Sequence, residues 1–395
     1  MTENGDAKAG RTRRRDPVYL DYQATTPLDE RALEAMMPYL TTRFGNPHSE
    51  SHRFGWEADA GVEVAREQIA ALIGAEAEEI IFTSGATESN NLAIKGVSRA
   101  LRGKRPHIVT VVTEHKCVIE SVRAMEREGA RVTVLPVKPD GLVDLEAYGN
   151  AIGEDTGLVS VMTVNNEIGV IQPIAEMAAM AHDKGARFHT DAAQAVGKIP
   201  IDIRTLGVDL MSISGHKLYG PKGIGALYVR RRPKVPLIPQ MDGGGQERGY
   251  RSGTLSPALC AGLGAACAIA GDILEEERGR ITALSKDFLG KLQRGLNGVV
   301  LNGSGTDRFY GNLNLSFEGV PGDSLMTRLR TVALSSGSAC ASGSGEPSYV
   351  LAAIGVEGDL AKASIRVGFG RQTTQEHVDF AAEEIISAVR DLRGA

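Results

Sequence analysis

Lys217 is a candidate for Schiff-base chemistry because of the residues on either side of it. It ends the segment Ser-Gly-His-Lys of residues 214–217, which follows the apolar run 209–214 and precedes the turn sequence YGPKG. The apolar run predicts a buried strand. Burial would lower the pKa of the amine and make it nucleophilic, as a bond to an aldehyde cofactor requires. A lysine taken alone in a turn is more often a surface residue, so the interpretation depends on the motifs around it.

Two further side chains that could serve an aromatic cofactor follow predicted strands. Asp191 follows Arg187–Thr190 and could keep a pyridinium nitrogen protonated, so that the ring acts as an electron sink. The alternative is an aspartate that caps the next helix. His115 follows the predicted strand 107–113 and could stack on such a ring and transfer protons, although a lone histidine is more often structural.

Residues 83–90, Thr-Ser-Gly-Ala-Thr-Glu-Ser-Asn, lie where a strand should give way to a helix. Main-chain N–H groups and hydroxyls at a helix N-terminus form an anion site, which would suit a cofactor phosphate. The pattern matches neither G-x-G-x-x-G nor GxxxxGK[ST], which argues against a dinucleotide and a P-loop nucleotide. An ordinary Ser/Thr helix cap is the alternative.

The elements that would position these residues alternate between strand and helix. Apolar runs predict strands at 79–83, 107–113, 131–137, 158–164, 187–190, 209–214 and 222–230, with helices between several of them. Such alternation predicts an α/β fold whose large domain has a mostly parallel, seven-stranded-type sheet covered by helices. Polar clusters follow five of the strands, so we expect them at one edge of the sheet, where ligands bind.

A second, smaller α+β domain is predicted after residues 251–254. It would begin with one or two long helices over 257–297 and add strands near 311–317 and 364–369, with helices at 322–330, 348–354 and 374–392. Cys340 lies in the Ser/Gly-rich stretch 335–345, which favours a mobile loop. The other cysteines, Cys117, Cys260 and Cys267, have apolar neighbours and are interpreted as structural.

Composition narrows the class of protein. The 395 residues include 49 acidic and 44 basic side chains, a formal net charge of −5, which argues against a dedicated nucleic-acid-binding protein. We expect no transmembrane helix, because we find no run of about 18 apolar residues. Residues 1–16 lack a secretory signal and are expected to form a disordered tail. Four scattered cysteines without a CxxC pair predict a reduced, cytoplasmic protein, with the mitochondrial matrix as a weaker alternative.

Taken together, the motifs resemble those of the cysteine desulfurases, class-V aminotransferase-like enzymes of fold type I that use pyridoxal 5′-phosphate. The resemblance extends from Tyr19 to about Arg393 and is greatest to the desulfurases of iron–sulfur assembly. Its most specific stretches are FGNPHS (44–49), FTSGATESNNLAIKG (82–96), TEHK (113–116), VNNEIG (164–169), HTDAAQAVGK (189–198), SGHKLYGPKGIGALY (214–228), RSGT (251–254), SSGSAC (335–340) and EPSYVL (346–351).

The resemblance implies a role for each matching residue. Lys217 would carry the cofactor, and His115 would stack on its ring and move protons. Asp191 would hold the pyridine nitrogen and Gln194 the phenolate oxygen. Residues that would bind the phosphate are Ala86, Thr87, Ser214 and His216, with Thr254 supplied by the neighbouring subunit of a homodimer. Asn166 and Arg366 would hold the substrate carboxylate, and Asn166 would also contact the cofactor. Cys340 would accept the sulfur.

The implied reaction converts L-cysteine to L-alanine and leaves a persulfide on Cys340, to be passed to an iron–sulfur scaffold or another acceptor protein. No intrinsic metal is expected, although Cys340 could transiently ligate a cluster on a partner. The implied domains are a large cofactor-binding domain (28–265) and a small domain (17–27 with 266–395) that carries the Cys340 loop. Alternatives are a selenocysteine lyase and a non-catalytic dimeric partner in sulfur transfer.

Two departures from the family pattern bear on partner binding. The loop reads CASGSGEPS (340–348), where the family usually has a run similar to CTSASLEPS, and the sequence stops at Ala395. We therefore expect weak or partner-dependent docking to a scaffold protein.

Overall fold

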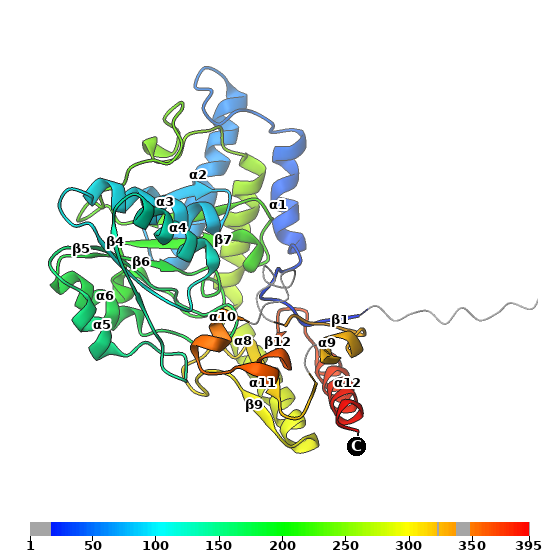
Figure 1. Cartoon of the computed structure of the whole chain (residues 1–395). Coiled ribbons are helices and arrows are strands. Elements are labelled where there is room, and N and C mark those ends of the chain that lie inside the picture. Colours follow the sequence, from blue (N-terminus) through cyan, green and yellow to red (C-terminus); the bar gives the residue numbers. More distant parts are fainter. Residues whose placement is uncertain (1–16, 322–323, 337–347, 395) are drawn as a thin grey trace, which may run out of the picture.

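A mostly parallel sheet of seven strands forms the centre of the larger part of the molecule (Figure 1). The computed structural model describes residues 17–321, 324–336 and 348–394, so Cys340 lies outside the described residues. The strand order is β2-β8-β7-β6-β5-β3-β4, and β8 alone in this sheet runs antiparallel to its neighbours. The strands are β2 (Ile80–Thr83), β3 (His107–Val111), β4 (Arg131–Leu135), β5 (Thr156–Ser160), β6 (Arg187–Asp191), β7 (Leu210–Ser214) and β8 (Gly225–Val229). The predicted fold class is confirmed.

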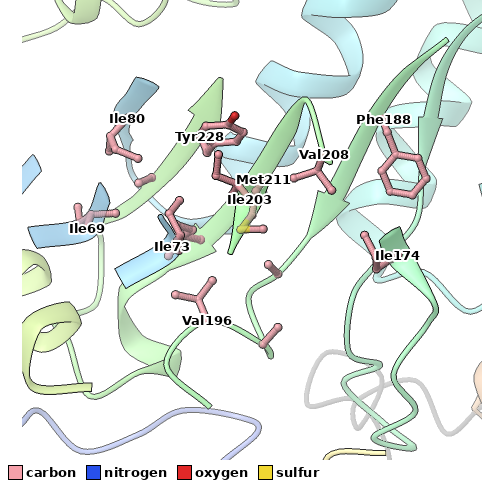
Figure 2. Close-up of a cluster of buried hydrophobic side chains, with 14 of the residues drawn as sticks. Ile69, Ile73, Ile80, Ile174, Phe188, Val196, Ile203, Val208, Met211 and Tyr228 are labelled. Atoms are coloured by element: carbon pink, nitrogen blue, oxygen red, sulfur yellow. The ribbon is translucent and has the colours of Figure 1, made fainter. Parts of the chain in front are cut away.

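Both faces of this sheet are buried except at the edge strand β4, which explains why strands such as β7 and β8 are largely apolar runs rather than alternating ones. In β8, Tyr228 packs into one apolar cluster and Leu227 into another, because successive side chains point to opposite faces. The first cluster, shown in part in Figure 2, also contains Phe188 of β6 and Met211 of β7. The helices of this part are α1 (Glu30–Thr41), α2 (Arg53–Ile73), α3 (Ala86–Leu101), α4 (Lys116–Arg127), α5 (Leu145–Ala151), α6 (Ile174–Asp183) and α7 (Ile203–Leu206).

The second unit is a three-stranded antiparallel sheet with helices, as predicted. Its strand order is β12-β10-β9, and its core includes Phe317, Ile365 and Ile385. A separate parallel pair joins β1 to β11, so the start of the described chain lies in this unit. The elements are β1 (Val18–Tyr19), β9 (Val299–Leu301), β10 (Asn312–Phe317), β11 (Val332–Ala333), β12 (Ser364–Gly368), α9 (Ser324–Arg328), α10 (Tyr349–Ala353), α11 (Gly358–Lys362) and α12 (Gln375–Arg393). The domain boundaries given above stay a prediction.

One helix, α8 (Pro257–Gly295), contributes to both cores. Leu263 packs into the core of the large sheet and Phe288 into that of the small sheet. Where α8 meets α2 its residues are small: a Cβ on Gly264 would lie 2.6 Å from Cα of Ala65. The two backbones therefore approach closely.

The same helix corrects one expectation. An 18-residue window of α8 has a mean hydropathy of 1.7, so by length and composition it could cross a membrane. Glycines and an aspartate interrupt the window, so it is not an unbroken apolar run. Since 56% of the window is buried inside the molecule, packing against α1 and α2 accounts for its apolar character.

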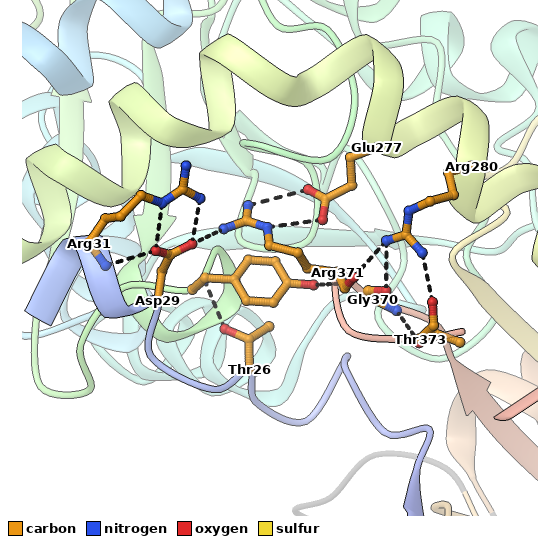
Figure 3. Close-up of polar contacts among 9 residues, drawn as sticks. Thr26, Asp29, Arg31, Glu277, Arg280, Gly370, Arg371 and Thr373 are labelled. Carbon is orange, nitrogen blue, oxygen red and sulfur yellow. Dashed lines mark hydrogen bonds and ion pairs between the residues drawn. The ribbon is translucent and has the colours of Figure 1, made fainter. Parts of the chain in front are cut away.

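A cluster of charged side chains joins the segment before α1 to α8 and to the loop after β12 (Figure 3). Arg371 Nη1 lies 2.6 Å from Asp29 Oδ2, and Arg371 Nε donates to Glu277 Oε1 at 3.0 Å. The guanidinium also lies 4.0 Å from the centre of the Tyr219 ring. We call Asp29, Tyr219, Glu277 and Arg371 the Arg371 cluster.

Candidate active site

A cavity of about 580 Å³ opens at the edge of the large sheet where β2, β3, β6 and β7 end. Most of the residues predicted for the site line it: Ala86, Thr87, His115, Asn166, Asp191, Gln194, Ser214, His216, Lys217 and Arg366. Thr254 is exposed and does not line the cavity. The polar clusters therefore meet at one sheet edge, as the alternation of strands and helices predicts.

Lys217 follows β7 in a short 3₁₀ turn, and the N-terminal segment holds its amine. Its Nζ donates to the main-chain oxygens of Gln23 and Ala24, the latter at 2.8 Å. These carbonyls orient the amine at the cavity wall, of which Gln23 and Ala24 are also part. No role was predicted for these main-chain groups, because only the folded chain brings them to Lys217.

Asp191 ends β6 and is buried among donors. Asn90 Nδ2 donates to its Oδ2 at 2.7 Å, and the main-chain N–H of Ala193 donates to its Oδ1 at 3.0 Å. The second contact is a local turn of the kind that the capping alternative anticipated. The carboxylate nonetheless lines the cavity, so it can also face a ligand there.

His115 is the N-cap of α4, and its Nδ1 accepts from the main-chain N–H of Cys117 at 3.2 Å. Burial lowers the pKa of His115, Asp191 raises it, and Lys217 and Lys116 lower it. The ring is therefore neutral near pH 7. Because Nδ1 accepts, the proton resides on Nε2.

Cys117 contributes to the site, which the sequence analysis missed. Its Sγ lies 2.9 Å from His115 Nδ1, accepts from Asn90 Nδ2 at 3.0 Å and lines the cavity. Burial, together with Asp191, raises its pKa to about 12, so the group is a neutral thiol. Its position two residues after a histidine at a helix start was the available signal. Cys260 and Cys267 are buried in the core, as expected of structural cysteines.

One end of the cavity is suited to an anion. The N-terminus of α3 lies there, and a Cβ on Gly85 (φ 147°) would meet nothing within 4 Å, so its main chain is open to the cavity. Lys222 and His216 line the same cavity. Burial, then Lys217, Lys222 and Lys198, lower the pKa of His216 to about 4, so this ring would bind a phosphate as a neutral donor.

Arg366 lies on β12 and brings the small unit to the cavity. It is 1% exposed, its Nη2 pairs with Asp21 Oδ1 at 2.8 Å, and its Nη1 donates to the main-chain oxygen of Asn166 at 3.1 Å. The buried Asn166 Oδ1 has no partner among the described residues. A planar guanidinium suits a carboxylate, and a buried amide oxygen without a donor suits a ligand that supplies one.

These observations fit pyridoxal 5′-phosphate. The cavity offers an amine, a buried carboxylate, a neutral histidine and an anion site, which correspond to the aldehyde, the ring nitrogen, the ring face and the phosphate. Three or more metal-ligating side chains do not come together anywhere in residues 17–321, 324–336 and 348–394.

Comparisons with known proteins agree with this chemistry. Residues 18–380 match the model of the family described as aminotransferase class-V. The chain is 57% identical over 377 residues to a protein named cysteine desulfurase IscS from Rickettsia bellii, covering 95% of this chain and 92% of that protein. A solved structure of a NifS-like protein superimposes with a TM-score of 0.88 at 35% identity, covering 95% of this chain and all of the other. Another, titled SspA in complex with cysteine, gives 0.81 at 37% identity, covering 90% of this chain and all of the other.

Proposed function

The chain belongs to the class-V aminotransferase family and, within it, to the cysteine desulfurases, and from this premise we propose how its own residues take sulfur from L-cysteine. The observation that carries the proposal is the meeting of Lys217, Asp191, His115 and Arg366 at one cavity. When bound there, pyridoxal 5′-phosphate supplies an aldehyde for an amine and a ring that accepts electrons.

We propose that the cofactor is held by groups on three sides. Lys217 Nζ provides the amine, Asp191 the carboxylate for the ring nitrogen, and Gln194 a donor for the phenolate oxygen. Ala86, Thr87, Ser214 and His216 bind the phosphate. Asn166 contacts the cofactor, and with Arg366 it binds the carboxylate of L-cysteine.

His115 and Lys217 move the protons of the reaction. The Nε2–H tautomer of His115 presents a proton on the nitrogen that the helix cap leaves free. Lys217 Nζ, in its free amine form, would take up and return a proton at the substrate carbon.

Cys340 is the proposed sulfur acceptor. Its thiolate attacks the substrate sulfur, an S–S bond forms, and the C–S bond breaks with its electron pair left on the carbon skeleton. Protonation of that carbon gives L-alanine, and Cys340 keeps the persulfide. The loop would then pass this sulfur to an iron–sulfur scaffold or another acceptor protein in the cytoplasm.

Two experiments test these assignments. Borohydride reduction followed by peptide mapping should place the cofactor on Lys217, and label on another lysine would overturn that assignment. Cys340→Ser should keep the yellow cofactor but lose sulfide release with cysteine and dithiothreitol. Half of wild-type activity in that variant would exclude Cys340 as the acceptor. Turnover of cysteine against selenocysteine separates the desulfurase from a selenocysteine lyase, and absence of both would favour a non-catalytic partner.

A homodimer is proposed because one apolar surface is left uncovered by the described residues. Large apolar side chains are exposed on α1, at the start of α2 and in the segment between them: Leu33, Met37, Leu40, Phe44, Phe54 and Trp56. Such a patch is typical of a protein interface. Thr254, exposed and outside the cavity of its own chain, would then reach the phosphate of the neighbouring subunit.

Subunit mixing tests this arrangement. Lys217→Ala chains and Thr254→Ala chains should each be impaired, and exchanged heterodimers should regain one intact site. Absence of recovery after confirmed exchange would show that Thr254 does not act across subunits.

A further inference from the structure

Lys198 lies close to the cavity, and the function proposed above does not use it. Its Nζ donates to Oε1 of Gln194 at 2.7 Å and lies 5.9 Å from the centre of the Phe309 ring. Burial, and then Lys217 and Arg366, lower its pKa to about 7, although Glu277 raises it. Burying a charged amine is unfavourable. The contact of the buried Lys198 with one amide oxygen therefore points to an effect on the orientation of that amide.

The contact determines which way round the Gln194 amide lies. A protonated lysine side chain has only donors, so in that state the atom that faces Nζ must be the amide oxygen. On the other side, Gln194 Nε2 donates to the main-chain oxygen of Gln23 at 3.0 Å, and a carbonyl can only accept. A flipped amide would place two donors together at one end and two acceptors together at the other.

This orientation leaves a donor for the cavity. Nε2 carries two hydrogens, and Gln23 takes one of them. Since Gln194 lines the cavity, the second hydrogen is available to a ligand there. The Gln23 oxygen also accepts from Lys217 Nζ, so one main-chain carbonyl connects the amide to the lysine that would carry the cofactor.

We propose that Lys198 is a positioning residue that holds Nε2 of Gln194 toward the cavity, so that it donates to the phenolate oxygen of bound pyridoxal 5′-phosphate. The proposal rests on the cofactor binding proposed above. Two effects favour the ionised phenolate: a donor held in the correct orientation and the positive charge that Lys198 carries when it is protonated.

The test is a spectroscopic pH titration of the cofactor-loaded enzyme, which reports the protonation of the bound cofactor rather than turnover. Lys198→Met removes both donor and charge and should raise the pH midpoint by about one unit, a tenfold change in the proton equilibrium. Lys198→Arg keeps both and should titrate within about 0.3 unit of wild type. Lys198→Gln, which can donate but also accept, should fall between them. Lys104→Met, at an exposed lysine, is the matched control and should leave the midpoint unchanged.

Measuring Lys198→Met in a second starting protein, Gln194→Leu, separates the effect of amide orientation from the effect of the lysine charge. In Gln194→Leu enzyme the amide is gone, so Lys198→Met should add less than about a third of its wild-type shift. An equal shift in both backgrounds would show that Lys198 acts by charge alone and would overturn the proposal. An unchanged midpoint in folded Lys198→Met would also overturn it, and if that variant does not fold, a wild-type midpoint in Lys198→Gln would do so. Failure of the wild-type protein to bind pyridoxal 5′-phosphate would instead refute the proposed function.

Discussion

The cavity and the Arg371 cluster lie on the two sides of one short turn, and they use polar groups in opposite ways. Lys217 faces the cavity, and Tyr219, which has φ 65°, packs against Arg371. In the cavity, amide and guanidinium atoms such as Asn166 Oδ1 and Arg366 Nε have no partner among the described residues. In the Arg371 cluster, opposite charges pair directly.

This difference indicates that the two regions have different roles, one in binding and one in stability. Polar groups in the cavity that lack a hydrogen-bond partner can bind a ligand and shift its protons. The paired charges of the cluster can only hold the turn in place. The strained backbone of Tyr219 persists because the surrounding contacts over-determine it.

The strongest test of the comparison replaces Lys217. Lys217→Ala should lower sulfide release by about a thousandfold or more, since both the covalent attachment and a proton-transfer group are lost. The free energy of unfolding should change by less than about 1 kcal/mol, because hydrogen bonds from the amine to main-chain oxygens each contribute little. Sulfide assays and urea titrations measure the two effects. A large loss of stability would show that this side of the turn is structural too.

Arg371→Met should give the opposite result. Glu277 would keep a buried charge without its ion-pair partner, and Asp29 would keep only Arg31, so we expect a loss of about 3 kcal/mol in the free energy of unfolding. Sulfide release per folded molecule should fall less than about tenfold, because no cavity residue is removed. Urea titration and active-site counting distinguish the effects. If Arg371→Met lost activity but kept its free energy of unfolding, the proposed separation of binding and stability between the two regions would be wrong.

Acid should affect the two regions in different pH windows. Burial lowers the pKa of His189, which lies in β6 beneath the cavity, to about 3. The unfolded chain therefore binds the extra proton first, so stability is full above about pH 6.5 and falls by about 1.4 kcal/mol per pH unit toward pH 3. Its hydrogen bonds with Ser160 and Ser212 could be kept by an amide. His189→Gln should thus reduce the slope of the unfolding free energy against pH in this window by the equivalent of about one proton.

Asp29, in the Arg371 cluster, affects stability in a lower pH range than His189 does. Hydrogen bonds from Arg31, and less strongly from Arg371, lower its pKa to about 2. Its contribution is complete above its ordinary pKa of 3.8 and is lost as the pH falls toward 2. Asp29→Asn should therefore leave the slope between pH 6.5 and 4 unchanged. A changed slope there would show that the two regions titrate together.

The smallest expected effect belongs to Cys117. Cys117→Ala removes a neutral hydrogen-bonding group from His115 Nδ1 and should lower kcat/KM by about threefold to tenfold. The pKa of His115, read from the acid limb of the pH–rate profile, should rise toward its ordinary value. Cys117→Ser should restore most of the loss. If the serine variant behaved as the alanine variant does, the thiol would act by packing rather than by hydrogen bonding.

The sequence predicted the sheet well because most of its strands are buried on both faces, and apolar runs such as those of β7 and β8 show this directly. It also predicted the groups at the sheet edge, since parallel strands bring their carboxyl ends together. The small α+β unit was predicted from the same kinds of pattern, apolar runs for its strands and helical spacing of apolar residues for its helices.

Contacts that depend on distant segments could not be predicted in the same way. Periodicity does not show that the carbonyls of Gln23 and Ala24 reach Lys217, or that Asp21 pairs with Arg366. The role of Cys117 was missed because its apolar neighbours suggested burial alone, whereas it lies at the start of α4 with its sulfur toward His115. The burial of the apolar stretch in α8 depends on its fit against α2.

The pairing of β1 with β11 sets the order in which the protein can be completed during synthesis. Residues 18 and 19 bond to residues 332 and 333, and Asp21 forms a bridge with Gly368. The ribosome makes these partners last, so the segment that supplies the Gln23 and Ala24 carbonyls must wait for almost the whole chain. A nascent chain that already contains the large sheet would still lack the contacts that orient Lys217. Cofactor capture should therefore be a late event, and chains stalled before β12 should remain colourless.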